Sequence, residues 1–398
     1  MSEWKKVKLG EVCDTQYGFT ASTVQQDTGT QFLRITDIVP QLIDWNTVPY
    51  CQIQEKDREK YLLHKGDIVV ARTGATVGYA KYIKEDVPAV FASYLVRLLV
   101  NSIDVDRHYV GLCVESNLFK EYIQSISNGS AQPNANAQMI SSFEINLPPL
   151  STQHRIATIL SRYDSLIENY QKQIKLLEEA AQRLYKEWFV DLHFPGHENT
   201  NIVDGVPEGW EKKPVKTIIE LQSGYAFKSS AFMEDGIYKI VTIKNVKDGA
   251  FDGENVSKIA SIPEKMPKHC ILEDGDILLS LTGNVGRVCI VNGKNYLLNQ
   301  RVAKLKSAYK AYTYCLFRSR DMFIEVNNLA NGAAQQNVSP IRIGEMKILI
   351  PEKKWLDDFE RTVSNYILGI ITLQSQIRFL TEARDRLLPK LMSGEIAV

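Results

Sequence analysis

Residues 156–188 read IATILSRYDSLIENYQKQIKLLEEAAQRLYKEW, and this stretch decides how the chain is organised. Its apolar residues recur at alternating steps of four and three: Ile156, Leu160, Tyr163, Ile167, Tyr170, Ile174, Leu177, Ala181, Leu184 and Trp188. This spacing averages about 3.5 residues and is typical of a coiled-coil helix. Such a helix is about 50 Å long and needs a partner to cover its apolar stripe.

A second stretch near the C-terminus has the same spacing and supplies that partner. Only Arg384 interrupts its apolar run, and each member lies 203 residues after its counterpart: Phe359, Val363, Tyr366, Ile370, Leu373, Ile377, Leu380, Arg384, Leu387 and Leu391. Because the first helix carries the chain from one globule to the next, pairing requires the second to run antiparallel. We then expect the globules at opposite ends of a rod, an approximate two-fold axis, and Met1 close to Val398. The alternative is that each helix packs on its own globule.

The segments before the two helices also repeat each other. The opening WKKVKL (residues 4–9) is echoed by WEKKPV (residues 210–215). KGDIVVARTG (residues 65–74) is echoed by DGDILLSLTG (residues 274–283). A Gly-Asp turn, a short apolar strand and a Thr-Gly turn leading to another glycine predict a β-hairpin in each copy.

Three further phrases recur in the same order. YGFT (residues 17–20) matches SGYAF (residues 223–227), and the strand-like FLRITDI (residues 32–38) matches YKIVTI (residues 238–243). NGSAQPN and NGAAQQN then precede the helices. The sequence therefore predicts an α+β protein with these parts: 1–150 first globule, 151–190 central coiled-coil helix, 191–209 connector without a core element, 210–352 second globule and 353–398 C-terminal coiled-coil helix.

Composition favours a globular protein that works in the cytoplasm. The chain is 44% hydrophobic and 24% charged, and its six cysteines include no CxxC pair. We expect reduced thiols, no metal site, no secretion signal and no membrane span. Residues 1–150 hold 14 basic and 17 acidic residues, whereas residues 210–350 hold 20 and 14. If the chain binds DNA, we expect other subunits to supply part of the phosphate neutralisation.

Catalytic motifs are incomplete wherever the sequence suggests one. Leu147-Pro148-Pro149-Leu150 has leucine where the loop of amino-methyltransferases needs a polar and an aromatic residue. Gly286 and Gly293 are seven residues apart, whereas the glycines of a phosphate-binding loop are five apart. His193 and His197 flank a Phe-Pro-Gly turn and do not share a helix face. We expect no catalytic residue and no cofactor on this chain.

The ordered phrases resemble the specificity subunit of type I DNA restriction-modification systems across nearly the whole chain. The resemblance includes the globule openings, the Gly-Asp-Ile hairpins, the Leu147-Pro148-Pro149-Leu150 and Gln153-His154-Arg155-Ile156 helix entry, and the C-terminal residues 387–396. It implies two target recognition domains joined by two long antiparallel coiled-coil helices with pseudo-two-fold symmetry. Each domain would read half of a bipartite, asymmetric double-stranded DNA target.

The same resemblance implies partners that perform the chemistry. Two methyltransferase subunits would carry S-adenosylmethionine and methylate adenine, and two restriction subunits would use ATP and Mg²⁺. The helices would set the half-site spacing and dock the partners. Two other interpretations stay open: a specificity subunit of a related methyltransferase or phage-defence system without type I restriction subunits, and a coiled-coil scaffold that binds proteins.

Candidate DNA contacts are polar residues at the glycine-rich turns, because bases are read by bidentate side chains and phosphates by many donors. In the first globule they are Tyr17, Arg34, Arg72, Thr73, Asn128, Gln132 and Asn134. In the second they are Tyr225, Lys228, Lys244, Asn245, Thr282, Asn284, Arg287, Gln335, Gln336 and Asn337. Features shared by both globules favour a scaffold role. Specific readers are expected where the globules differ: residues 21–30, 41–59, 251–268 and 295–306.

Overall fold

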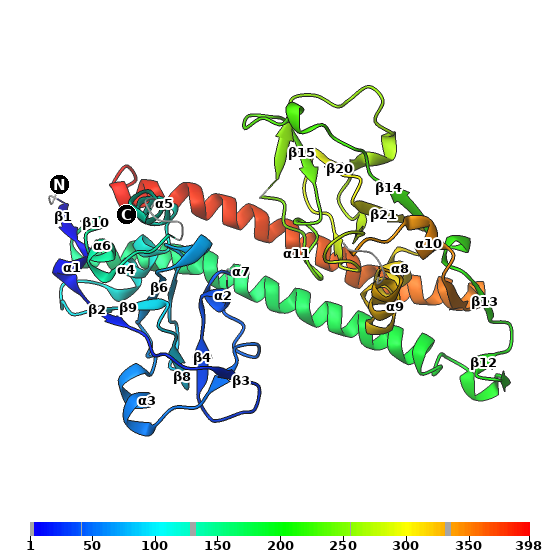
Figure 1. Ribbon diagram of the computed structural model, residues 1–398, viewed down its shortest axis with the longest axis horizontal. Helices are drawn as coiled ribbons and strands as arrows, with labels where there is room; N and C mark the ends of the chain where they lie inside the picture. The colour runs from blue at the N-terminus through cyan, green and yellow to red at the C-terminus, as the bar shows by residue number, and fades with distance from the viewer. Residues whose placement is uncertain (1–3, 41, 128–132, 255, 331–335) are drawn as a thin grey trace. The chain divides into compact units, whose positions relative to one another are not determined.

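A computed structural model describes residues 4–40, 42–127, 133–254, 256–330 and 336–398 (Figure 1). The chain forms two compact units, each made of one globule and parts of both long helices. Unit 1 is Met1–Glu168 with Leu380–Val398, and unit 2 is Asn169–Phe379. The long helices are α7 (Leu150–Tyr185), which continues as the π-helical turn η2 (Lys186–Val190), and α11 (Lys353–Ser393).

Unit 1 contains short strands and a few short helices. The strands are β1 (Lys5–Lys8), β2 (Cys13–Tyr17), β3 (Thr23–Val24), β4 (Gln31–Leu33), β5 (Tyr50–Cys51), β6 (Ile68–Ala71), β7 (Ala80–Tyr82), β8 (Ala89–Phe91), β9 (Leu95–Val100) and β10 (Glu144–Leu147). The helices are α1 (Leu9–Val12), α2 (Ile35–Ile38), α3 (Glu55–Tyr61), η1 (Gly74–Thr76), α4 (Arg107–Val114), α5 (Asn117–Ser127) and α6 (Ala137–Ser141).

Unit 2 contains the corresponding elements and a small hairpin of its own. The strands are β11 (Ile202–Val203), β12 (Val206–Pro207), β13 (Glu211–Pro214), β14 (Glu220–Ser223), β15 (Tyr238–Val241), β16 (Ser257–Ile259), β17 (Ile271–Leu272), β18 (Ile277–Ser280), β19 (Val288–Ile290), β20 (Tyr296–Leu298), β21 (Val302–Lys306) and β22 (Lys347–Ile350). The helices are η3 (His197–Asn199), η4 (Val215–Thr217), η5 (Ser229–Ala231), η6 (Lys268–Cys270), α8 (Lys310–Arg318), α9 (Arg320–Ala330) and α10 (Pro340–Gly344).

The two units share the strand order of one sheet and the parallel pair of another. The first four-stranded sheet has the order β2-β9-β6-β7 in unit 1 and β14-β21-β18-β19 in unit 2. A second sheet contains the parallel pair β4–β8 in unit 1 and β15–β20 in unit 2. A two-stranded ribbon, β1–β10 or β13–β22, closes each globule before its long helix. The expected α+β fold with two similar globules is confirmed.

The predicted hairpins are confirmed, and the structure explains the aspartate in each Gly-Asp turn. The Asp67 carboxylate lies 2.9 Å from Arg97 on β9, and the Asp276 carboxylate lies 2.7 Å from Lys304 on β21. The side chains of Asp67 and Arg97 are only 6% and 7% exposed. Removing one member of such a buried pair leaves an unpaired charge, so the aspartate is needed to hold the hairpin on the sheet.

One predicted strand is only partly a strand. In residues 32–38 the strand β4 ends at Leu33, and Ile35–Ile38 forms the helical turn α2. The Asp37 carboxylate accepts a 2.8 Å hydrogen bond from the Arg34 backbone nitrogen and closes this turn. The alternation of β-branched residues favoured a strand, but this local side-chain cap determines the conformation instead.

In unit 1, the start of α7 and the end of α11 lie antiparallel. The Asn146 side-chain nitrogen, just before α7, donates a 3.1 Å hydrogen bond to the Met392 carbonyl oxygen. Further along α7, Asp164 pairs with Arg384 at 2.8 Å. Residue numbers therefore rise along α7 as they fall along α11 (Figure 1).

The two ends of the described chain both lie in unit 1. A Cβ on Gly394 would lie 3.3 Å from the Trp4 ring, and Val398 packs against the same apolar cluster as Trp4. The expected closeness of the termini is therefore confirmed from Trp4 onward, and Met1 lies outside the described residues.

In unit 2, the end of α7 and the start of α11 also lie antiparallel. Leu177 lies 3.2 Å from where a Cβ on Gly369 would be, and the Trp188 ring centroid is 5.7 Å from that of Phe359. None of the predicted seam residues of either helix is exposed. The aromatic contact of Trp188 shows that this side chain belongs to the core of unit 2.

The connector contributes to the core, contrary to the prediction for residues 191–209. Phe194 is fully buried, with its ring centroid 5.0 Å from those of Trp210 and Trp355. The stretch as a whole is rich in turn-forming and acidic residues, so its composition predicted a connector and gave no sign that this one large apolar residue is buried. Its burial anchors the chain where it leaves α7.

The only polar position in the second predicted seam has an ionic partner in unit 1. Arg384 and Asp164 pair with side chains 21% and 18% exposed. The residues related to them by the 203-residue repeat are Ala181 and Ile367, which are buried in the core of unit 2. The same level of the helix pair is therefore ionic in unit 1 and apolar in unit 2.

This difference predicts the outcome of a substitution pair. Asp164→Ile alone should lower the free energy of unfolding by about 1–2 kcal/mol, because it leaves a largely buried arginine short of one partner. Asp164→Ile combined with Arg384→Ala should recover most of that loss, because it copies the apolar pair of unit 2. Urea unfolding followed by circular dichroism measures both variants.

The exposed pair Glu382–Arg386 provides the control, because Glu382→Ala should cost about 0.5 kcal/mol or less. A double variant as unstable as Asp164→Ile would contradict the interpretation of the seam.

Candidate nucleic-acid interface

A Thr-Gly turn follows the first strand of each hairpin, and its glycine has a backbone conformation that other residues adopt only with strain. Gly74 and Gly283 have φ angles of 78° and 71°, and Gly78 and Gly286 have 87° and 86°. These left-handed conformations strain residues that carry a Cβ. The repeated glycines therefore maintain the backbone of the turn in both units.

The asparagine-rich phrase of each unit is joined to this turn. Asn134 forms an antiparallel bridge with Thr73, and Asn337 forms the corresponding bridge with Thr282. The Gly283 nitrogen also donates a 3.0 Å hydrogen bond to the Gln336 carbonyl oxygen. Segments far apart in the sequence thus meet at one place on each unit.

In unit 1, three of the predicted residues gather at this place. The Arg72 guanidinium lies 5.0 Å from the centroid of the Tyr17 ring and donates a 3.3 Å hydrogen bond to the Asn134 side-chain oxygen. Its Nε atom is buried and has no hydrogen-bond partner among the described residues. Tyr17 is 44% exposed, so the cluster combines a cation, an amide and an accessible aromatic ring.

The same place in unit 2 has different chemistry. Leu281 occupies the position of Arg72, because its nitrogen makes the same hydrogen bond to the turn between the two four-stranded sheets. Tyr225 corresponds to Phe19 and not to Tyr17, since both pair with the strand before that turn. Ser223 stands where unit 1 has Tyr17, in agreement with the match of YGFT to SGYAF.

Several predicted residues are occupied in holding the fold. Asn245 is fully buried, where its side chain accepts from the Thr242 nitrogen at 2.8 Å and donates to the Asp252 carbonyl oxygen at 2.9 Å. Thr282 is 6% exposed and donates to the Asn337 side chain at 2.9 Å. Arg34 pairs with Asp37. The burial of Asn245 and Thr282 argues against direct contact of their side chains with a base.

The remaining predicted residues differ in accessibility. Lys228, Lys244, Asn284 and Gln336 are exposed, Arg287 is half-buried, and the three basic side chains make no ion pair with any residue that the structure describes. Asn128, Gln132 and Gln335 lie outside the described residues. Unit 2 thus offers more unpaired positive charge at its turns than unit 1.

Two residues that the sequence did not single out lie at the same place. Tyr94 is 59% exposed, and its carbonyl oxygen accepts a 3.0 Å hydrogen bond from the Arg72 nitrogen. Arg301 is exposed, and its carbonyl oxygen accepts a 3.0 Å bond from the Leu281 nitrogen. Arg301 falls in a segment expected to differ between the globules. The signal for both was a short polar turn between two apolar strands.

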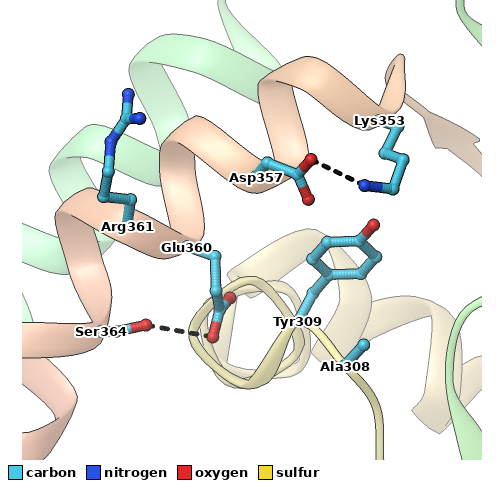
Figure 2. Close-up of a pocket in the computed structure, with 7 residues that line it drawn as sticks. All are labelled: Ala308, Tyr309, Lys353, Asp357, Glu360, Arg361 and Ser364. Carbon is cyan, nitrogen blue, oxygen red and sulfur yellow. Dashed lines mark hydrogen bonds and ion pairs between the residues drawn. The ribbon is translucent and has the colours of Figure 1, made fainter.

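A hollow beside α8 and α11 has charged walls that neutralise one another (Figure 2). Lys353 pairs with Asp357 at 2.9 Å. The Glu360 carboxylate accepts hydrogen bonds of 3.0 Å from the Ala311 nitrogen and 3.3 Å from the Tyr312 nitrogen. Glu360 therefore caps the N-terminus of α8 and is occupied by main-chain hydrogen bonds.

The cysteines are unsuited to nucleophilic chemistry. All six are buried, and burial raises the pKa of Cys13 and Cys113 to about 12. The thiolate form is therefore suppressed at neutral pH. Within the described ranges there is no group of three or more His, Cys, Asp or Glu side chains placed to hold a metal.

The described helices also include none that is long and apolar enough to cross a membrane.

Comparison with known proteins connects this architecture to a family. The sequence model of the type I restriction modification DNA specificity domain matches residues 1–179 and again residues 207–363. The MjaIX specificity subunit of Methanocaldococcus jannaschii is 28% identical over 84% of this chain and 78% of its own length. The HindI specificity subunit of Haemophilus influenzae is 21% identical over the full length of both.

A solved structure shares the fold. The crystal structure of the type I restriction-modification S subunit from M. genitalium matches 98% of this chain and 96% of its own, with a TM-score of 0.57 and 16% identity. The domain match covers most of the chain and occurs twice, once in each half. This protein therefore belongs to the family of type I restriction-modification DNA specificity subunits.

Proposed function

We propose that this chain reads a bipartite, asymmetric DNA target, with one half-site contacted by each unit. The observation that carries the proposal is that the two units present different side chains on the same backbone. Arg72 and Tyr17 lie beside the Thr-Gly turn in unit 1, where unit 2 has the buried Leu281 and the exposed Ser223. Equal scaffolds with unlike surfaces suit two unlike half-sites.

The chemistry would belong to partner subunits. In this proposal two methyltransferase subunits bind S-adenosylmethionine and methylate adenine, while two restriction subunits use ATP and Mg²⁺. This chain would contribute specificity and bind no cofactor. The surplus of acidic residues in residues 1–150 supports a need for partners, because a DNA-binding surface must offset phosphate charge.

The long helices offer a matched pair of apolar side chains for docking the two methyltransferase subunits. Leu176 on α7 is 64% exposed, and Phe379 on α11 is 57% exposed. The two positions correspond in the 203-residue repeat. Equivalent exposed apolar residues favour two identical partners over one, because each partner can use the same contact.

The first prediction concerns the unaltered protein. Co-expression with its methyltransferase subunit should produce adenine methylation at a single split motif, because each unit contributes one half-site. Single-molecule sequencing of the host chromosome measures the motif. Methylation that is absent when both subunits are soluble and associated would overturn the proposed function and favour a protein-binding scaffold.

The second prediction concerns the spacing of the half-sites. Four residues inserted after Glu168 in α7 and four after Phe379 in α11 lie at the boundary between the units, so each unit keeps its own contacts. Four helical residues add about 6 Å, close to two base pairs. The spacer should lengthen by about that amount while both half-sites stay the same.

The matched control is a four-residue insertion between Asp204 and Gly205, at the turn of the β11–β12 hairpin. This insertion leaves both long helices unchanged and should not alter the spacer. An unchanged spacer in the helix variant would refute the idea that helix length sets the spacing.

The third prediction concerns the docking positions. Leu176→Glu and Phe379→Glu should each weaken binding of the methyltransferase subunit, and together they should reduce its stoichiometry toward zero, because a buried glutamate would lose its hydration. Analytical ultracentrifugation measures the complex. Ile103→Glu is the control, since Ile103 is 91% exposed in unit 1 and away from both helices in sequence. Full complex formation by the double variant would rule out this surface.

A further inference from the structure

The turn that joins the two four-stranded sheets has the same backbone in both units. It connects β8 to β9 in unit 1 and β20 to β21 in unit 2. The Leu95 nitrogen donates to the Ala92 carbonyl oxygen at 2.8 Å, and the Val302 nitrogen donates to the Asn299 carbonyl oxygen at 2.9 Å. The central residues are Ser93 and Tyr94 in unit 1, and Gln300 and Arg301 in unit 2.

Backbone hydrogen bonds fix this turn on both sides. The Ser93 nitrogen donates to the Phe19 carbonyl oxygen at 2.8 Å, and the Gln300 nitrogen donates to the Tyr225 carbonyl oxygen at 3.0 Å. On the other side, the carbonyl oxygens of Tyr94 and Arg301 accept from the strand-end nitrogens next to the Thr-Gly turns, each at 3.0 Å. The contacts use main-chain atoms, so they do not depend on which side chains the central residues carry.

A glycine in each unit allows this close packing. A Cβ on Gly18 would lie 2.2 Å from the Ala92 carbonyl oxygen, and one on Gly224 would lie 2.2 Å from the Asn299 carbonyl oxygen. Any other residue would push the turn away from its neighbour. The shared glycine therefore preserves the position of the turn while its central side chains differ.

The central side chains of unit 2 are of the types that read bases. Gln300 and Arg301 are both exposed, and neither side chain makes a hydrogen bond or ion pair with any residue in the described part of the chain. An arginine can donate two hydrogen bonds to guanine O6 and N7, and a glutamine can pair with adenine. Because the turn is rigid, binding has to order only the side chain and not the backbone.

We infer that the turn Asn299–Val302 is a base-reading element of unit 2 and that Arg301 recognises a guanine in its half-site. This inference rests on the proposed function, because it assigns a residue to the reading of one half-site. In unit 1 the same turn presents Ser93 and Tyr94, which lack a pair of parallel donors. The two turns thus occupy equivalent positions in the two units but carry side chains that would read different bases.

The test uses the full chain with its methyltransferase subunit and reads the methylated motif by single-molecule sequencing. Arg301→Ala should lower the preference for guanine about tenfold to a hundredfold at one position of one half-site. Arg301→Gln should shift the preference at that position toward adenine. The other half-site should stay unchanged in both variants.

Lys306→Ala is the matched control. Lys306 is a basic residue at the end of β21, the strand that follows the turn; its side chain is 64% exposed and lies 3.7 Å from Glu220. Its loss should leave the motif as it is. Circular dichroism should show the same thermal unfolding for all three variants and the unaltered chain.

The outcomes separate the two claims. If the unaltered subunit directs no methylation, the proposed function fails and the turn assignment fails with it. If it directs methylation but Arg301→Ala and Arg301→Gln leave the motif unchanged, only the turn assignment is overturned. Uniform loss across all sequences in both variants also overturns it, since that is the behaviour of a phosphate contact. A change confined to one position of one half-site supports it.

Discussion

The structure depends on a heptad seam that neither long helix can bury alone. Exposing the apolar stripe of either helix to water would be unfavourable in free energy, because the stripe is long. Each stretch of α7 therefore requires a stretch of α11 beside it. In unit 1 this requirement is met by the first part of α7 and the last part of α11, and in unit 2 by the reverse combination. Each globule is therefore built around a helix pair drawn from two distant parts of the chain.

In each unit, the backbone of the turns is the same, whereas the side chains that the turns carry differ. Buried ion pairs, left-handed glycines and main-chain hydrogen bonds fix the turns, and these features occur in both units. The side chains at corresponding positions are unlike: Arg72 against the buried Leu281, and the exposed Tyr94 against the exposed Arg301. A recognition surface on such a scaffold can change its sequence preference without a change of fold.

The fold could largely be predicted from the sequence, whereas the candidate interface could be predicted only in part. The seams, the repeated hairpins and the α+β class follow from periodicity and from glycine at turns, which are local signals. The burial of Phe194 and that of Asn245 depend on residues elsewhere in the chain, so composition could not reveal them. The helical turn α2 depends on the local cap from Asp37, which the strand-like alternation of residues 32–38 did not indicate. Arg301 was missed because its exposure on a fixed turn becomes visible only when β20 and β21 are placed.

The division of the chain between the units has a consequence for the order of folding during synthesis. Unit 2 is one uninterrupted segment, Asn169–Phe379, so all of its parts are synthesised before the Leu380–Val398 part of unit 1. Unit 1 begins before unit 2 but lacks Leu391 and Met392 of its core until its second segment, Leu380–Val398, has been made. The domain made earliest is thus completed last, and a prematurely terminated chain would expose the apolar surface of its N-terminal half to proteolysis.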